Sequence, residues 1–104
     1  MILREIAHTR SGDKGDTSNI SVIAFDPADY ELLRREVTGA RVKGVLGAMV
    51  QGEVERYELP HLGALNFVLH RALAGGVTRS LALDTHGKCL GSLLLSLEID
   101  NARR

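Results

Sequence analysis

The sequence predicts a single α+β domain, in which a mixed β-sheet is covered by helices. The chain has 104 residues, of which 44% are hydrophobic and 25% are charged. These are ordinary values for a globular domain with its own core. Strand-like and helix-like segments follow one another in the order β-β-α-α-β-α-β-α, which is typical of an α+β fold. We therefore expect one domain over residues 1–104, without an internal repeat or a linker.

Two strands separated by a long polar loop are predicted at the start of the chain. Residues 2–9 are rich in apolar side chains and predict a strand. Residues 10–18 contain two glycines, two aspartates and no apolar side chain, which predicts a loop. Residues 19–25 are almost continuously apolar or β-branched, as in a central strand that is buried on both faces.

Two helices are predicted next. Asp26 can cap a helix over residues 27–37, and Pro27 suits its first turn because proline lacks only an N–H that would be unpaired there. Gly39 follows the expected end of this helix. Residues 40–48 predict a second, shorter helix that contains two glycines.

The second half of the chain gives less uniform patterns. Residues 50–59 predict a strand whose alternation is broken by Arg56, through a bulge or because this arginine points inward. Residues 60–74 predict a helix, because four leucines form one stripe at helical spacing. Residues 78–84 predict a strand that ends in a turn at 85–87. The leucines of residues 89–99 fit a helix and a strand equally well, and we favour the helix.

The charge balance and the cysteine count exclude several classes of protein. Lys and Arg number 13, and Asp and Glu number 13, so the basic surplus that is usual in nucleic-acid-binding proteins is missing. The single cysteine, Cys89, permits no intrachain disulfide and no cysteine-based metal cage. No signal peptide and no membrane-spanning run is recognisable, so we expect a cytoplasmic protein that binds neither nucleic acid nor membrane.

The densest group of chemically active side chains lies between His8 and Asn19. His8 is the candidate general acid–base group, and Asp13 and Asp16 are candidates for proton transfer, orientation of a ligand or binding of a cation. The candidate ligand-binding residues of this segment are Arg10, Ser11, Lys14, Ser18 and Asn19. Three interpretations compete: an anion cradle, a site for a hard cation, and a solvated turn whose side chains bond to their own backbone.

A second group lies around Arg56 and Asn66. Asn66 falls at the edge of the leucine stripe, where an amide needs a partner in the chain or in a ligand, so both residues are candidate ligand-binding residues. In the predicted helix Phe67 points away from the stripe and favours a contact surface. No nucleotide motif and no metal-ligand spacing is present, so the sequence indicates neither a metal site nor a named cofactor.

Four stretches resemble the C-terminal domain of the acyclic terpene utilisation (AtuA-like) proteins. They are Ala7 to Ile20 (AHTRSGDKGDTSNI), Val54 to Pro60 (VERYELP), Leu65 to Leu69 (LNFVL) and Gly75 to Leu81 (GGVTRSL), and the resemblance covers residues 3–99. It implies a ferredoxin-like α+β fold, a two-layer sandwich with the helices packed on one face of the sheet. It also implies a role in the breakdown of terpenoid or branched acids as acyl-CoA esters.

Two hypotheses about function follow. In the longer members of this family a large domain precedes the one found here, so we expect a partner that is a separately encoded large AtuA-like chain. The first hypothesis is an accessory subunit, not catalytic alone, whose polar loop binds an acyl-CoA or carboxylate ligand in a site that the partner completes. The second is a non-catalytic module that forms a homo-oligomer or docks on a partner. We favour the first and expect a homo-oligomer in either case.

Overall fold

The computed structural model describes residues 1–14, 17–72 and 88–100 and contains a four-stranded sheet. The strands are β1 (Ala7–Lys14), β2 (Thr17–Ala24), β3 (Val54–Leu59) and β4 (Ala64–Leu69). Their order across the sheet is β1-β2-β4-β3, and each neighbouring pair is antiparallel. The expected mixed sheet included a strand over residues 78–84, which lie outside the described residues.

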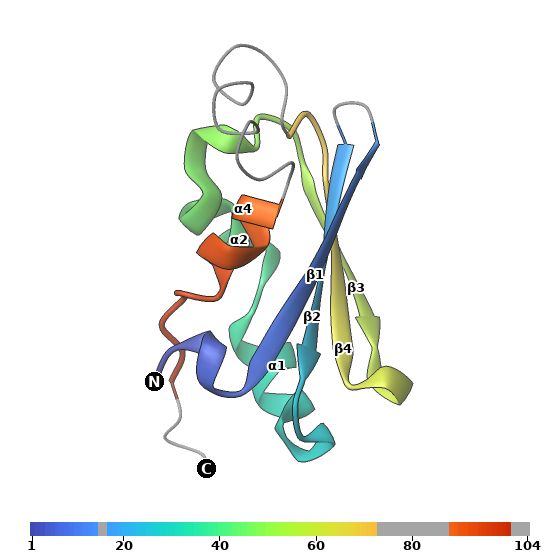
Figure 1. Cartoon of the computed structure of the whole chain (residues 1–104), viewed down its shortest axis with the longest axis vertical. Helices are drawn as coiled ribbons and strands as arrows, with labels where there is room; N and C mark the ends of the chain where they lie inside the picture. Colours follow the sequence, from blue (N-terminus) through green and yellow to red (C-terminus); the bar gives the residue numbers. More distant parts are fainter. Residues whose placement is uncertain (15–16, 73–87, 101–104) are drawn as a thin grey trace.

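The three described α-helices lie on one side of this sheet (Figure 1). They are α1 (Tyr30–Glu36), α2 (Gly39–Leu46) and α4 (Lys88–Leu94). Helix α4 contacts β1, α2 contacts β3 and α4, and α1 contacts the central strands β2 and β4. Short 3-10 turns complete the described elements: η1 (Leu3–Glu5), η2 (Pro27–Asp29), η3 (Gly47–Met49) and η4 (Pro60–Leu62). The α+β class and the two-layer arrangement predicted from the sequence are confirmed.

The core lies between the sheet and the helices. Alternate residues of the central strands point toward the helices and are buried, among them Ile20 and Val22 of β2 and Leu65, Phe67 and Leu69 of β4. The helices contribute a matching set of buried residues, which includes Leu32, Leu33, Val42, Leu46, Leu90 and Leu94. Among the described helices, none covers the opposite face of the sheet, which we call the open face (Figure 1).

The order of the elements is a rearranged ferredoxin-like order. Taken from β2, the described elements run β2, α1 with α2, β3, β4, α4 and β1, which is β-α-β-β-α-β. The chain does not run directly from α4 to β1; instead, the first residues, 1–4, lie beside residues 95–99, which follow α4 (Figure 1). The amide of Leu3 donates to the carbonyl of Leu97 at 2.8 Å, and the amide of Ile99 donates to the carbonyl of Met1 at 2.8 Å. β1 therefore occupies the edge position that the last strand of a β-α-β-β-α-β chain would take.

The strand and helices predicted over residues 19–48 are confirmed. β2 covers most of the predicted strand, and η2 with α1 covers most of the predicted helix at 27–37. The carboxylate of Asp26 accepts a hydrogen bond from the amide of Ala28 at 3.0 Å, as expected of a cap. Helix α2 matches the helix predicted over 40–48, and its cap is the hydroxyl of Thr38. Gly39 is the first residue of this helix and does not terminate the preceding one.

The loop predicted over residues 10–18 is wrong. These residues continue β1 to Lys14 and begin β2 at Thr17, so the polar segment is a hairpin paired from Ala7 and Ala24 onward. Since β1 is an edge strand, its side chains need not be apolar on both faces. The pattern of apolar residues therefore does not identify residues 10–14 as part of a strand. The turn signal was nevertheless present in the sequence: Gly15-Asp16 is a two-residue hairpin dipeptide.

The helix predicted over residues 60–74 is also wrong. Only the turn η4 forms at Pro60, and Gly63 ends it with a φ of +62°. The residues that follow form the central strand β4, in which Leu65, Phe67 and Leu69 alternate on one buried face. Phe67, predicted to point outward, is fully buried on the helix side of the sheet.

Three boundaries differ from the prediction. The strand expected at 2–9 begins only at Ala7, after η1. The strand expected at 50–59 begins at Val54, and Val50 forms an isolated bridge with Ala72. The helix favoured over 89–99 is confirmed as far as Leu94. The turn predicted at 85–87 lies outside the described residues.

Candidate functional site

The open face of the sheet carries rows of side chains whose positions follow from the strand register. The middle row runs across all four strands as Arg10, Ser21, Asn66 and Tyr57. The amide of Asn66 donates to the hydroxyl of Ser21 at 2.9 Å across β2 and β4. This bond supplies the partner that Asn66 was predicted to need, and it fixes a polar centre on the open face.

Arg10 lies between two shallow hollows. The first has a volume of about 360 Å³, lies on the open face, and is lined by Arg10, Ser21 and four apolar residues: Ile23, Leu59, Leu62 and Ala64. The second has a volume of about 400 Å³ and is lined by Thr9, Arg10, Ser11 and Ser92. One hollow is thus mainly apolar and the other is lined by hydroxyl groups. Arg10 lines both hollows.

The hydroxyl-lined hollow is formed where α4 approaches β1. Thr9 and Ser11 point to the helix side of β1, since they pair with the buried Val22 and Ile20. A Cβ atom on Gly91 would lie 2.7 Å from the Ser11 hydroxyl oxygen and 2.9 Å from that of Thr9. Only a glycine lets the helix come this close while both hydroxyls keep their positions.

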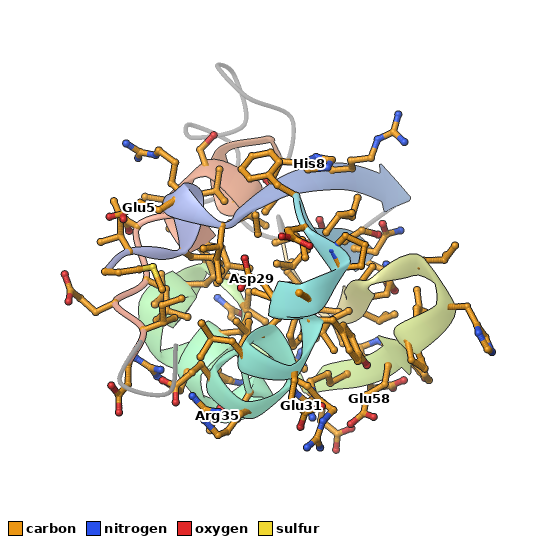
Figure 2. All side chains as sticks on the ribbon, turned by 90° about the horizontal axis from the view of Figure 1, so that it is seen from below. Glu5, His8, Asp29, Glu31, Arg35 and Glu58 are labelled. Atoms are coloured by element: carbon orange, nitrogen blue, oxygen red, sulfur yellow. The ribbon has the colours of Figure 1, made fainter. Side chains whose placement is uncertain are left out.

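His8 lies at one end of the open face. It is exposed on β1 and stacks on Phe25, with ring centroids 5.4 Å apart and an angle of 21° between the planes. Figure 2 shows His8 on β1, on the other side of the molecule from Glu31 and Arg35 of α1. His8 and Arg10 are two residues apart on one strand and therefore share the open face.

A chain of polar contacts occupies the opposite edge of the open face. The hydroxyl of Tyr57 donates to the carboxylate of Glu55, whose other oxygen is 2.7 Å from Nε2 of His70. The hydrogen bond from Tyr57, followed by that from His70, lowers the pKa of Glu55. The bond to Glu55 in turn raises the pKa of Tyr57. A carboxylate is thus held ionised at the β3 edge, while a cation, Arg10, lies at the β1 edge.

Two of the predicted ligand-binding residues bond within the chain. Ser18 is fully buried, and its hydroxyl donates to the carbonyl of Gly12 across the hairpin at 3.0 Å. Arg56 points to the helix side, where Nη1 donates to the carbonyls of Arg34 at 2.7 Å and Val37 at 2.9 Å. These carbonyls lie at the end of α1, where helix carbonyls lack partners within the helix. The interrupted alternation in β3 therefore marks an arginine that caps a helix.

The remaining predicted residues belong to the hairpin or to its connection. Asn19 is exposed on the open face beside Gly12. In the register Asp13 pairs with Ser18 and Lys14 pairs with Thr17. Asp16 lies outside the described residues. Of the predicted site, the structure brings Arg10, Asn66, Asn19 and His8 to one face and Ser11 to the adjacent hollow.

Sequence reasoning missed the apolar part of this site. Leu59 and Leu62 line the open-face hollow, and Glu55 and His70 form an ion-pair contact. The signal for the first pair was weak, because both leucines fitted the predicted strand and helix as core residues. His70 was placed on a helix, where no register could bring it to Glu55.

Within the described residues, no group of three or more histidine, cysteine, aspartate or glutamate side chains is placed to hold a metal ion. No helix of the described residues is both long and apolar enough to cross a membrane.

Comparison with family models shows to which protein family this chain belongs. The model of the AtuA ferredoxin-like domain matches residues 1–100. The chain belongs to the AtuA ferredoxin-like domain family. A search of curated proteins gave no significant match. A search of solved structures gave none either. For this AtuA ferredoxin-like domain the match confirms the resemblance carried by the polar segment and the three later motifs.

Proposed function

We propose that this AtuA ferredoxin-like domain is an accessory component of an enzyme that breaks down terpenoid or branched acids as acyl-CoA esters. It contributes Arg10 and the two adjoining hollows to a ligand site that a partner chain completes. The domain is not catalytic alone. The proposed partner is a large AtuA-like chain, which corresponds to the domain that precedes this one in longer members of the family.

The observation that supports this proposal is the position of Arg10 between an apolar and a hydroxyl-lined hollow. A branched acid or its coenzyme A ester combines an anionic or polar group with an apolar chain. A guanidinium binds a carboxylate or a phosphate through paired hydrogen bonds, and hydroxyls can add further donors. The aliphatic side chains of Leu59, Leu62 and Ile23 would then receive the apolar chain.

The shallowness of the hollows supports a role for a partner. Ligand pockets typically enclose most of the surface of a small ligand. Hollows of about 360 and 400 Å³ are at the lower end of the range of such pockets, and both open onto the surface. A second chain over the hydroxyl-lined hollow would exclude water and strengthen the contact with Arg10, because charges interact more strongly at low dielectric.

His8 is the proposed proton-transfer group of this site. It shares the open face with Arg10, and an imidazole has one nitrogen that can accept a proton and one that can donate it. Asp13 and Asp16 are proposed to orient the ligand or to transfer protons, on the basis of residue type and their place in the same polar segment of the sequence. Lys14 and Asn19 are proposed to add contacts to an anionic ligand.

The first experiment identifies the partner. The tagged chain is recovered from its native host, and the recovered complex is analysed by mass spectrometry and by its native mass. A large AtuA-like chain in fixed stoichiometry is the expected result. Recovery of this chain alone, from cells that express the large chain, would contradict the proposed partnership.

The second experiment tests Arg10 in the recovered complex. Turnover and binding are measured with a branched acyl-CoA, the free branched acid and coenzyme A alone. Arg10→Gln is expected to weaken binding by at least about tenfold, the scale of one charged hydrogen bond. Arg35→Gln on the helix side is the matched control and should leave binding unchanged. Unchanged binding in folded Arg10→Gln would refute the proposed site.

A further inference from the structure

The large apolar side chains most exposed in the described residues gather at the open face. They are Phe25 at 62%, Leu62 at 69%, Tyr57 at 50% and Leu59 at 36% exposure. Tyr57 and Leu59 lie on β3 and point to the open face, while Leu62 lines its hollow. Phe25 reaches the same face through its stack on His8. A grouped apolar surface of this kind is typical of a contact with another macromolecule.

The rows of the open face are complementary to themselves. In the middle row Arg10 lies at one edge and Tyr57 at the other, with Ser21 and Asn66 between them. A two-fold axis nearly parallel to the strands, between β2 and β4, would turn a second sheet so that its β3 faces the first β1. Arg10 of one copy would then meet Tyr57 of the other, next to the ionised Glu55, and Ser21 would meet Asn66.

The neighbouring row matches in the same way. It runs from His8 through Ile23 and Ala64 to Leu59. The same axis places the stacked His8 and Phe25 of one copy over Leu59 of the other, and Ile23 over Ala64. A single rotation therefore brings Arg10 to Tyr57, beside the carboxylate of Glu55, and brings the stacked rings and the aliphatic side chains of the neighbouring row together.

We propose that the open face binds a second copy of this chain, forming a two-fold dimer in which the two sheets pack face to face. Packed sheets lie about 10 Å apart, which leaves room for the side chains of both inner faces. A four-stranded face of six-residue strands measures roughly 19 by 20 Å. An interface of this size lies below the total area of about 1,200 Å² at which stable specific interfaces begin, so we expect a weak dimer with micromolar affinity.

The dimer would also close the apolar hollow beside Arg10, and this consequence rests on the proposed function. The second copy would cover the hollow lined by Leu59 and Leu62, while the large chain would cover the hydroxyl-lined hollow near Ser92. The dimer itself depends only on the complementarity of the open face. The experiments can therefore refute the dimer and support the ligand site, or support the dimer and refute the ligand site.

The test is a charge-reversal and mixing experiment followed by analytical ultracentrifugation over the low to high micromolar range. The wild-type chain is expected to be dimeric at the upper end. Arg10→Glu places two pairs of like charges in the dimer, since each new glutamate meets Glu55 of the other copy. Glu55→Arg likewise places two pairs of like charges in the dimer, because each new arginine lies near Arg10 of the other copy. Each variant alone should dimerise at least about tenfold more weakly.

Mixing the two variants restores both attractive pairs in a heterodimer. The mixture is therefore expected to regain a dissociation constant close to that of the wild type. Glu31→Arg, on the helix side, is the matched control and should dimerise like the wild type. If Glu55→Arg loses its native circular dichroism, Tyr57→Arg replaces it, because this arginine would meet Arg10 of the other copy and, in the mixture, the glutamate of Arg10→Glu.

Three results would overturn the proposal. They are a wild-type chain that stays monomeric over the whole range, dimerisation that is unaffected by Arg10→Glu, and a mixture that is no more dimeric than its components. Binding of the acyl-CoA probes by the recovered complex is measured separately. Loss of that binding in Arg10→Gln, with a monomeric wild-type chain, would retain the ligand site and reject the dimer.

Discussion

Replacement of Arg56 by methionine separates a structural role from ligand binding. Arg56→Met keeps an unbranched apolar side chain in place of the arginine stem and removes the guanidinium that bonds to the carbonyls of Arg34 and Val37. It also removes the contact of Nη2 with Glu58 at 3.0 Å. The side chain of Arg56 is only 23% exposed, so water replaces these bonds incompletely.

The expected loss of stability follows from these contacts. Hydrogen bonds that involve a charged group contribute about 1.5 to 3 kcal/mol each. The pair with the half-exposed Glu58 adds at most about 1 kcal/mol. Since partial hydration recovers some of the loss, we expect Arg56→Met to lower the free energy of unfolding by about 2 kcal/mol. For a domain of this size that corresponds to a fall in Tm of roughly 10 °C.

Urea unfolding followed by circular dichroism measures this change, and Arg35→Met is the matched control. Arg35 is an exposed arginine whose contacts are longer, at 3.4 Å to Glu36 and 3.5 Å to the carbonyl of Asp100. Its replacement should change the stability by less than about 0.5 kcal/mol. A loss below about 0.5 kcal/mol for Arg56→Met, or a loss of acyl-CoA binding in the folded variant, would refute the capping role.

Three further predictions test the strand assignment, the helix contact and the polar cluster. Phe67→Ala should lower the free energy of unfolding by about 3 to 5 kcal/mol, while Phe25→Ala should have little effect; similar losses in urea unfolding would contradict the burial of Phe67. Gly91→Ala should cost about 1 to 3 kcal/mol and displace the hydroxyls of the adjacent hollow, seen as amide shifts in β1 by NMR; unchanged stability and shifts would show that the contact is loose. The lowered pKa of Glu55 stabilises the fold above the unfolded-state pKa near 4.5, and this contribution is lost as the pH falls through the lower, folded-state pKa. Urea midpoints of the wild type and Glu55→Gln should therefore converge in acid, and a gap that persists there would count against the pairing.

Local chemistry was sufficient to predict the middle of the chain. Asp26 and Pro27 predict the start of a helix by themselves, because Asp26 caps the first turn and Pro27 has a suitable fixed φ. The apolar, β-branched run of β2 predicts a buried strand in the same local way. Such signals do not depend on what lies across the sheet. The broken alternation at Arg56 left two explanations open, a bulge or an inward-pointing side chain, and the structure shows the second.

The errors arose where the spacing of apolar residues fits both the period of a helix and the period of a strand. Leu65 and Leu69 are four residues apart, which suits a helical stripe and one face of a strand equally. Gly63, with its positive φ, ends the turn at Pro60 and lets the chain continue as a strand, but a glycine alone does not reveal that conformation. Burial of Phe67 then decides the outcome, and burial is a property of the whole fold.

The polar hairpin shows how the position of a strand in the sheet permits a binding surface. β1 is the edge strand, so its open-face side meets solvent and its inner side, near Ser11, meets Gly91 and Ser92 rather than leucines. Hydroxyls and a guanidinium cost little stability there, whereas on the helix side of β4 they would lie in the core among Leu65, Phe67 and Leu69. The juxtaposed chain ends place β1 at this edge after α4, and Arg10 thereby reaches both hollows. The site therefore depends on the rearranged order of the elements as much as on the residues of the motif.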